Sequence, residues 1–311
     1  MVSVPKTNPI PQLSIVVPVF GDSAAFEATL VSVLENQPSC SEVIVAHDGS
    51  YDDPFDLADE VRLVESQAST FGSLVGSASH QARGRFVHVL GSGLLATEGW
   101  TDSAVHLFDH FDTAAVSPLI QSRGTGELMA AGWKNRLGRL MEPSLSVPEE
   151  DQYSSRTVGA YLPASFWRRD VLRSLQDSFD GDDLLETSLV YHYLLRKAGW
   201  RTELAAGSRL QSDSGFFPWD QSGVRRSMRL AALRDHFIGA SKLQSLISAG
   251  IAFARTIIQP SLMGDSFGQL LSPFVSQVED SIHEDSVLSC DQQGMIVTLS
   301  RSGSSSIRRA A

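Results

Sequence analysis

Cysteine is almost missing from this sequence, which has two among 311 residues, Cys40 and Cys290. Two cysteines far apart in dissimilar contexts make a disulfide framework implausible, so a reducing cytoplasm is the expected compartment. The N-terminus lacks the basic and apolar regions of a signal peptide. The longest apolar run, residues 246–259, is too short to span a bilayer and is interrupted by Arg255.

Positive charge is also scarce, because 25 Lys and Arg stand against 36 Asp and Glu, a net charge of -11. A chain this acidic repels the phosphates of nucleic acid unless it has a local basic patch. The sequence has no basic arm and no paired Cys/His spacing typical of zinc modules. These absences argue against a DNA or RNA partner.

What is present is an alternation of apolar strands and helical segments. Residues 13–20, LSIVVPVF, form a nearly continuous apolar run typical of a central parallel strand. Further strands are predicted over 42–50, 61–66 and 85–91, with helical patterns between them. The alternation predicts βαβ units and a mostly parallel sheet flanked by helices, an α/β fold.

In such sheets ligands bind beyond the carboxyl ends of the strands, where the strand order reverses. These ends are expected at Phe20–Asp22, His47–Ser50 and Gly91–Gly93. Turn and helix-start residues cluster there. The edge that they share is therefore the predicted binding site.

The second half continues the α/β pattern. A helix is predicted over 97–111, a strand over 114–121 and a strand running into a helix over 159–175. Residues 122–155 are polar and Gly-rich, which predicts an irregular surface excursion. The segment 182–200 predicts a helix whose acids lie at its N-terminal end and whose bases lie at its C-terminal end, matching the helix dipole.

Beyond about residue 220 the pattern is helical only, which predicts a C-terminal helical extension. We divide the chain into a lead-in (1–12), an α/β domain (13–220), the extension (221–276) and a disordered tail (277–311). The segment 242–259 has one apolar face. That face can dock on its own domain, pair with another subunit or lie on a membrane, and docking on its own domain is the commonest case. The face comprises Leu243, Leu246, Ile247, Ile251, Ala254, Ile257 and Ile258.

Five segments, in order, resemble motifs of glycosyltransferase family 2. They read SIVVPVFGD (14–22), VIVAHDGSYDD (43–53), FVHVLGSGLLATEGW (86–100), GAYLPASFWRRDVLRSLQDSFDG (159–181) and LLRKAGWRT (194–202). The resemblance covers about residues 13–213. It implies the GT-A fold, a nucleotide-sugar donor and a sugar or glycan acceptor.

The resemblance also implies which residues bind the nucleotide. They are Pro18, Phe20, Asp22, His47, Asp48, Gly91, Ser92 and Gly93.

The motifs depart from the family at the metal site. His47 stands where the family has its first aspartate, and Gly91-Ser92-Gly93 stands where it has the DXD carboxylates that hold the metal. None of these three side chains is a useful ligand for Mn²⁺ or Mg²⁺, so either ion would be weakly held or absent. A hypothesis for the replacement is that the turn aims successive N–H groups at the diphosphate.

Local structure offers an alternative for each nucleotide-binding candidate. Asp48 can cap the strand exit in an Asx-turn, and Asp22 can be a helix N-cap. His47 can be a half-buried strand histidine. Trp100 and Trp167 can stack on sugar or fill the core.

Asp183 and Glu186 are the candidate catalytic residues. An inverting transferase needs one carboxylate to take the proton of the acceptor hydroxyl, and residues three apart share a helix face. The alternative is that both simply complement the helix dipole. Nearby, Arg225, Arg226 and Arg229 form a basic patch, which meets phosphate or an anionic membrane, or is merely a solvated helix face.

The sequence thus predicts a transferase that moves a sugar from a nucleotide donor. The missing carboxylates favour an alternative, an inactive GT-A domain that serves as a binding or scaffold protein in a polysaccharide pathway. An unrelated doubly wound binding protein is disfavoured, because no GxGxxG follows the first strand. The expected location is the cytoplasm, with peripheral contact to the inner face of the membrane through the C-terminal helices.

Overall fold

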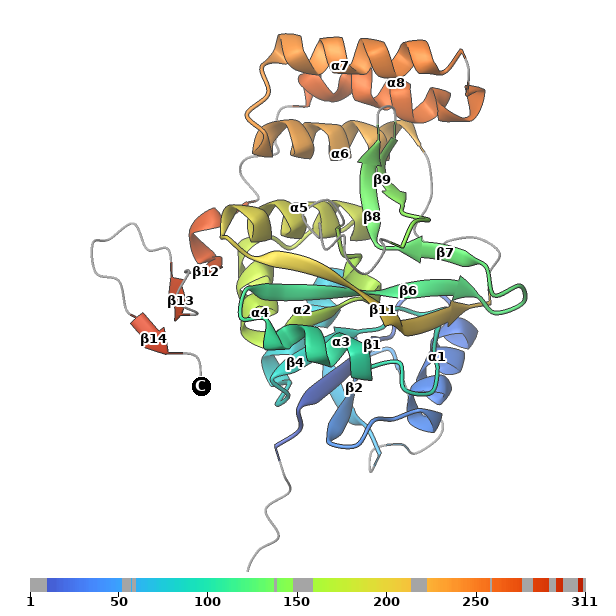
Figure 1. Ribbon diagram of the computed structural model, residues 1–311, viewed down its shortest axis with the longest axis vertical. Coiled ribbons are helices and arrows are strands. Elements are labelled where there is room, and N and C mark those ends of the chain that lie inside the picture. Colours follow the sequence, from blue (N-terminus) through green and yellow to red (C-terminus); the bar gives the residue numbers. More distant parts are fainter. Residues whose placement is uncertain are drawn as a thin grey trace, which may run out of the picture.

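The computed structural model describes residues 10–51, 57, 60–136, 139–147, 159–213, 223–257, 259–275, 282–290, 295–298 and 307–309. One large sheet forms its centre, with a layer of helices stacked beyond one side (Figure 1). The remaining residues, among them most of the predicted lead-in and parts of the predicted tail, lie outside the described ranges.

The sheet has nine strands in the order β3-β2-β1-β4-β10-β6-β11-β5, with β7 paired to β6. Strands β1, β2, β3 and β4 pair in parallel, as do β6 and β11, whereas β10 is antiparallel to both β4 and β6. The predicted mostly parallel α/β fold is confirmed. The strands are β1 (Leu13–Pro18), β2 (Ser41–His47), β3 (Arg62–Glu65), β4 (Phe86–Val89), β5 (Leu94–Ala96), β6 (Thr113–Ser122), β7 (Leu128–Ala131), β10 (Phe166–Arg168) and β11 (Arg201–Ser212).

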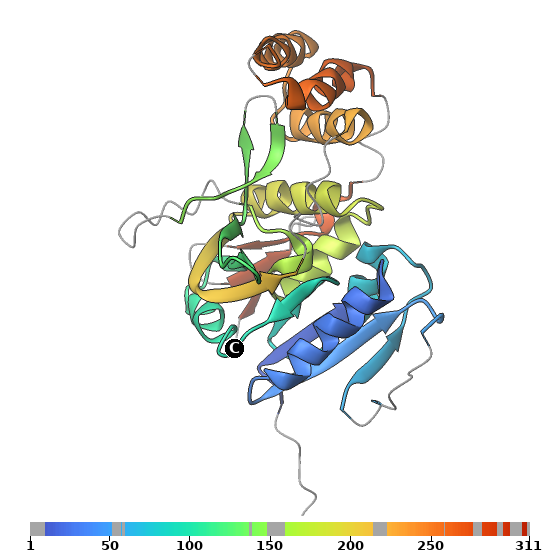
Figure 2. The same cartoon turned by 90° about the vertical axis from the view of Figure 1, so that its right-hand side faces the viewer.

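Helices cover both faces of the sheet. Helix α1 connects β1 to β2, and α2 connects β3 to β4, which lies in the opposite direction along the sheet. Because crossovers between parallel strands are right-handed, the two helices lie on opposite faces of the sheet. α4 and α5 extend the layer of α2, and Figure 2 shows α5 above the sheet edge. The helices are α1 (Ser23–Glu35), α2 (Phe71–Gln81), α3 (Asp102–His106), α4 (Arg169–Ser178) and α5 (Leu184–Lys197).

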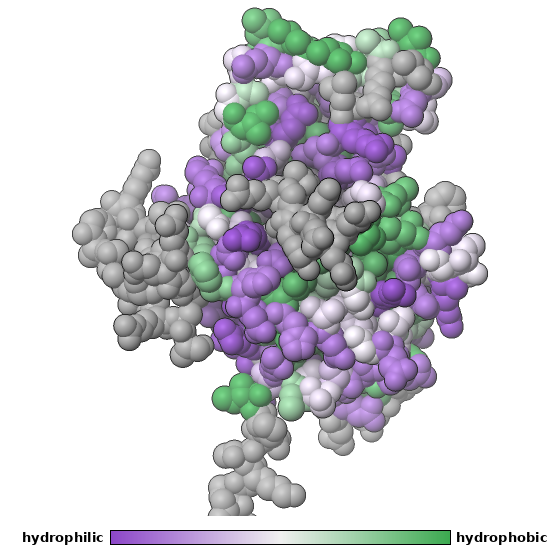
Figure 3. Space-filling model, in the orientation of Figure 1, coloured by the Kyte–Doolittle hydropathy of each residue, from purple (hydrophilic) through white to green (hydrophobic). Residues whose placement is uncertain are grey.

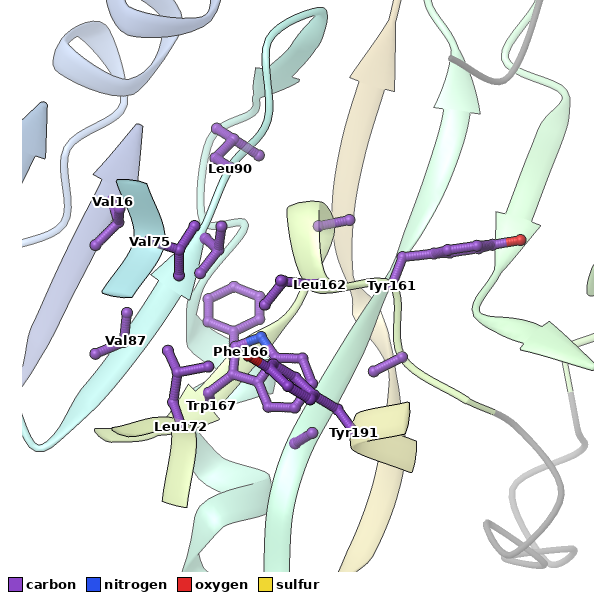
Figure 4. Packing of buried hydrophobic residues seen from close by; sticks show 14 of the residues in the cluster. Val16, Val75, Val87, Leu90, Tyr161, Leu162, Phe166, Trp167, Leu172 and Tyr191 are labelled. Atoms are coloured by element: carbon purple, nitrogen blue, oxygen red, sulfur yellow. The ribbon is translucent and has the colours of Figure 1, made fainter. Parts of the chain in front are cut away.

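The core lies between the sheet and these helices, and its aromatic centre comes from β10. Figure 4 shows Phe166, Trp167 and Tyr191 packed close together, with Leu162 beside them. The Trp167 and Tyr191 rings meet edge to face with centroids 6.1 Å apart. Trp167 therefore fills the core, and Trp100 is equally buried, so neither indole is available to stack on a sugar.

A hairpin stands where the sequence predicts an irregular excursion. Strands β8 (Trp133–Arg136) and β9 (Arg139–Pro143) pair antiparallel and rise from the end of β7 toward the C-terminal helices (Figure 1). The Trp133 side chain anchors the hairpin, because its Nε1 donates to the Ala160 carbonyl at 3.0 Å and its indole packs against Gly159. Residues 137–138 and 148–155 of the predicted excursion lie outside the described ranges.

Three helices form the C-terminal layer: α6 (Val224–Phe237), α7 (Lys242–Arg255) and α8 (Met263–Leu271). α6 lies along α5, where the Tyr193 and Phe237 rings stack with centroids 5.2 Å apart. α8 packs so closely on α6 that a Cβ at Gly268 would overlap the Val224 carbonyl oxygen. Among the described residues, no helix combines the length and apolarity needed to cross a bilayer.

Part of the tail returns to the α/β domain, where the sequence predicts disorder. The His283 N–H donates to the Ser178 carbonyl and the Cys290 N–H to the Ala198 carbonyl, both at 2.8 Å. The Trp200 indole donates to the Leu288 carbonyl at 2.6 Å. The segment 282–290 therefore seals the end of α4 and α5, and its last strand, β12 (Leu288–Cys290), begins a small antiparallel sheet with β13 (Met295–Thr298) and β14 (Ile307–Arg309).

Gly159→Ala tests whether the Trp133 anchor holds the hairpin. The new methyl group would overlap the buried indole, so we expect the free energy of unfolding to fall by about 1–3 kcal/mol, as for an overpacked core. Urea denaturation measures it. Gly124→Ala is the control, since a Cβ there meets nothing within 4 Å. Equal stability of the two variants would contradict the packing role of Gly159.

Candidate functional site

The candidate site lies at the sheet edge where β1, β2, β3 and β4 end. Pro18 pairs with Ala46 and Val16 with Val89, so these strands end together. The chain leaves β1 for β2 on one side and returns to β4 on the other, so the strand order reverses between β1 and β4. Open α/β sheets bind ligands outside the carboxyl ends of strands at such a point.

The turn after β4 is tied to its neighbours by hydrogen bonds. The Ser92 hydroxyl donates to the Phe20 carbonyl at 2.9 Å, which joins the exits of β4 and β1. The Gly91 N–H donates to the Pro163 carbonyl at 2.8 Å, and the Gly93 N–H to the Thr29 hydroxyl at 3.0 Å. Both glycine N–H groups thus serve the protein itself. The hypothesis that successive N–H groups of this turn face an anion is wrong for these two.

Gly93 has a backbone reason to be glycine. Its φ is +89°, a region that other residues rarely adopt, and a Cβ there would meet nothing within 4 Å. The turn is therefore small, left-handed at Gly93 and bordered by open space. This is a shape that a ligand can approach closely, without side-chain groups that would coordinate it.

The residues after β2 form a local turn. Asp48 accepts hydrogen bonds from the Ser50 N–H at 3.1 Å and the Ser50 hydroxyl at 2.5 Å. These bonds, the hydroxyl's first, lower the pKa of the exposed Asp48 carboxyl. His47 is half-buried, and its Nδ1 accepts the Gly49 N–H at 3.1 Å. The Asx-turn foreseen for Asp48 is present, and its carboxylate stays at the surface of the edge.

The residues after β1 have similar local roles. Asp22 caps α1 by accepting the Ala25 N–H at 3.0 Å, so the N-cap alternative is confirmed. Pro18 is buried as the last residue of β1. Phe20 is partly exposed and meets Phe71 of α2 edge to face, with centroids 5.6 Å apart. Phe20 thus gives the site an apolar rim.

The acidic residues lie at the start of α5, and Asp183 is fully engaged there. Its Oδ1 accepts the N–H groups of Leu185 and Glu186 at 2.8 and 3.1 Å, the bonds of a helix N-cap. Its Oδ2 accepts from Nη2 and Nε of Arg226 at 2.8 and 3.1 Å. Four hydrogen bonds on one carboxylate leave Asp183 poorly suited to take a substrate proton.

Glu186 is buried, with 2% of its surface exposed. Its Oε2 lies 2.7 Å from Nη2 of Arg229. Burial raises the pKa of Glu186 to about 7, while the Arg229 charge opposes the rise and Asp183 adds to it. A carboxylate with a pKa near neutrality is well matched to general-base work.

Arg226 and Arg229 of the basic patch both reach from α6 to the acids of α5. The alternative of a merely solvated helix face is therefore wrong for these two guanidinium groups, although the Arg229 side chain stays 44% exposed. The sequence contains one signal for this contact, a shared spacing of three residues. Asp183 and Glu186 lie three apart at the start of α5, and Arg226 and Arg229 lie three apart on α6, so the two pairs can match when the helices run side by side. Arg225 is exposed.

A divalent metal does not fit the turn after β4. Gly91 and Gly93 carry no ligand atoms, and the Ser92 hydroxyl is already hydrogen-bonded to Phe20. Across the described ranges, no group of three or more His, Cys, Asp or Glu side chains could hold a metal ion. Neither Mn²⁺ nor Mg²⁺ therefore has a built site among these described residues.

Comparison with known proteins finds no matching family model and no matching curated protein sequence. Solved structures do match. S. aureus TarS 1-349 in complex with UDP-GlcNAc aligns with a TM-score of 0.53 and 13% identity, over 79% of this chain and 73% of that one. The mannosyltransferase PcManGT from Pyrobaculum calidifontis, in complex with GDP-Man and Mn²⁺, aligns with a TM-score of 0.51 and 14% identity, over 87% of this chain and 88% of that one.

GalNAc-T7 with UDP, GalNAc and Mn²⁺ aligns with a TM-score of 0.51 and 15% identity, over 74% of this chain and 50% of that one. At such low identity the likeness concerns the fold. The chain has the GT-A glycosyltransferase fold, as the sequence motifs implied.

Glu186→Gln tests the buried acid through the pH dependence of stability. The pKa is about 7 in the folded chain and about 4.5 for an ordinary glutamate, so the folded state holds the proton more tightly. Wild-type stability should therefore fall as the pH rises from 4.5 to 7, by up to about 3 kcal/mol, and then level off. The glutamine variant lacks this loss, so its stability relative to wild type should rise over the same window.

Denaturation at several pH values measures this difference, and Glu98→Gln, at an exposed glutamate, is the control. Parallel pH profiles for wild type and Glu186→Gln would show that Glu186 ionises normally in the folded chain.

Proposed function

We propose that this protein binds a nucleotide-sugar donor at the edge formed by β1, β2 and β4 and transfers the sugar to a sugar or glycan acceptor. The observation that carries the proposal is the reversal of strand order between β1 and β4 in a GT-A fold, with small residues after β4 leaving open space. Structural neighbours bind UDP-GlcNAc and GDP-Man. Five family 2 motifs in order support assignment to that family.

In this proposal Glu186 is the general base. Its carboxylate takes the proton from the acceptor hydroxyl, the acceptor oxygen bonds to the anomeric carbon, and the bond from that carbon to the nucleoside diphosphate breaks. The diphosphate leaves with the electron pair. The pKa of Glu186, about 7, supports this role near neutral pH. Asp183 holds the start of α5 and positions Glu186.

The ion pair with Arg229 restricts this chemistry. Glu186 is 2% exposed, so an acceptor hydroxyl reaches it only if α6 and α5 separate locally at Arg229. Transfer therefore requires a conformational step as well as donor binding. No step in the proposal passes through a metal ion.

A second candidate is a GT-A domain that binds a nucleotide or a partner without turnover, in a polysaccharide pathway. Specific observations favour it: Asp183 and Glu186 are both engaged by arginines, and the turn after β4 has no metal ligands. The two candidates share donor binding and differ in turnover.

We also propose a cytoplasmic location, with the C-terminal helices in contact with the inner face of the membrane. Cys40 and Cys290, which are not joined by a disulfide, support a reducing compartment.

Thermal unfolding with UDP, GDP and their sugars, with and without Mn²⁺, tests donor binding. A ligand that binds only the folded state, at about 100-fold above its Kd, should raise the Tm by about 5 °C. We expect a shift with at least one nucleotide sugar and no dependence on Mn²⁺. Release of nucleoside diphosphate in the presence of acceptor glycans then separates the candidates. Nucleotide binding without release of nucleoside diphosphate favours the second candidate. If no nucleotide shifts the Tm, donor binding is wrong for both candidates.

Asp48→Ala tests whether Asp48 contacts the nucleotide as well as its own turn. Losing a charged hydrogen-bond acceptor at the ligand should weaken nucleotide binding by roughly tenfold or more, measured by calorimetry. Ser50→Ala is the matched control, because it removes the hydroxyl bond to Asp48 but keeps the carboxylate and its bond from the backbone N–H of residue 50. Equal weakening by both variants would assign Asp48 to the turn alone.

A further inference from the structure

Helix α7 turns its small residues inward. Ser245, Ala249, Ala252 and Thr256, spaced three or four apart, are buried. The Ser266 hydroxyl of α8 donates to the Ala252 carbonyl at 3.2 Å, so this small-residue face packs directly on α8. The contact needs little side-chain volume, and the helices approach closely.

The large apolar residues of α7 point the other way, opposite to the arrangement of an ordinary surface helix. Figure 3 shows hydrophobic residues along the top of the molecule, over α7. We call this set the outer face of α7: Leu243, Leu246, Ile247, Ile251 and Ile257. Ile257 is 84% exposed. The expectation that this stripe docks on its own domain is wrong; Ile258, also in the stripe, lies outside the described residues.

The outer face belongs to a wider concentration of exposed apolar side chains. Of the 17 exposed large hydrophobic residues in the described ranges, ten lie between Ile238 and Phe274. Met263 and Phe267 of α8 are among them. Contiguous exposed apolar surface of this kind marks an interaction site in a soluble domain.

The charges around the outer face are one-sided. No acid occurs from residue 236 to 264, in a chain that has 36 acids, and the charged residues of α7 are Lys242 and Arg255. The next acid, Asp265, is buried and accepts the Gly223 N–H at 3.0 Å. The surface is therefore apolar, with the exposed Lys242 at one end and no acid from residue 236 to 264, whereas the chain as a whole has a charge of -11.

We infer that the outer face of α7 docks on the surface of an anionic lipid bilayer, with its leucines and isoleucines in the interface and Lys242 at the headgroups. Interfacial helices combine an apolar face with basic residues, and their binding grows with buried apolar area and anionic lipid. A second copy fits less well, because a two-fold contact would set this acid-free face against itself and give Lys242 no anionic partner. This inference specifies the membrane contact included in the proposed function.

Vesicle flotation tests the inference on the full chain, without nucleotide or acceptor. We expect binding to vesicles of phosphatidylcholine mixed with phosphatidylglycerol, and weaker binding to phosphatidylcholine alone or at high salt. The double substitution of Ile247→Glu with Ile251→Glu should reduce binding by about tenfold or more. Lys242→Gln should reduce binding to the anionic vesicles only.

Val31→Glu is the matched control, because Val31 is 52% exposed on helix α1, as Ile251 is on α7. It should bind vesicles like wild type. Circular dichroism and the nucleotide-induced Tm shift verify that each variant folds and keeps its donor site, so loss of docking is distinguishable from failure of the nucleotide proposal. Absence of wild-type binding to anionic vesicles, or equal loss in Val31→Glu, would overturn the inference. A dimer in sedimentation that the α7 substitutions dissociate, without vesicle binding, would assign the face to a second copy.

Discussion

Two ion pairs between α5 and α6 hold the C-terminal layer against the α/β domain. Arg226 binds the cap carboxylate Asp183, and Arg229 lies on the buried Glu186. Water reaches both pairs, because Arg226 and Asp183 are 23% and 26% exposed and Arg229 is 44% exposed, so each pair is weaker than a fully buried one. A carboxylate that loses its partner can also take up a proton. Glu186 has that option, because its pKa already lies near 7. The pairs thus join the C-terminal helices to the α/β domain, and the Arg229 charge opposes the burial that raises the pKa of Glu186.

The sheet edge keeps the backbone geometry of the GT-A fold but lacks the carboxylates that would hold a metal ion in the turn after β4. The strand ends, the reversal of order and the left-handed turn at Gly93 form the candidate site. The carboxylates nearest to it are committed to local structure: Asp22 to a helix cap, Asp48 to an Asx-turn. The proposed transfer would therefore need groups other than paired acids with a metal to stabilise the departing diphosphate. The fold alone does not decide whether transfer persists.

The C-terminal layer connects this edge to the far end of the molecule. α6 contacts the site acids on one side and α8 on the other, and α8 carries α7 (Figure 1). A bilayer bound at the outer face of α7 would therefore lie two helices away from Glu186. The inner face of α7 carries small residues, which allow close packing on α8, and its bulky apolar residues face outward, where the proposed bilayer would bind.

The sequence by itself determined strands β1 to β4, the helix cap at Asp22, and the order of elements that indicates a GT-A fold. These follow from local rules, since apolar runs and capping residues act within a few positions. Tertiary structure decided the rest. The antiparallel insertion of β10, the pairing of β5 with β11 and the contacts of Arg226 and Arg229 join residues far apart in the chain. Periodicity showed that α7 has an apolar face, but the direction of that face depends on which side α8 covers, and no local pattern contains that information.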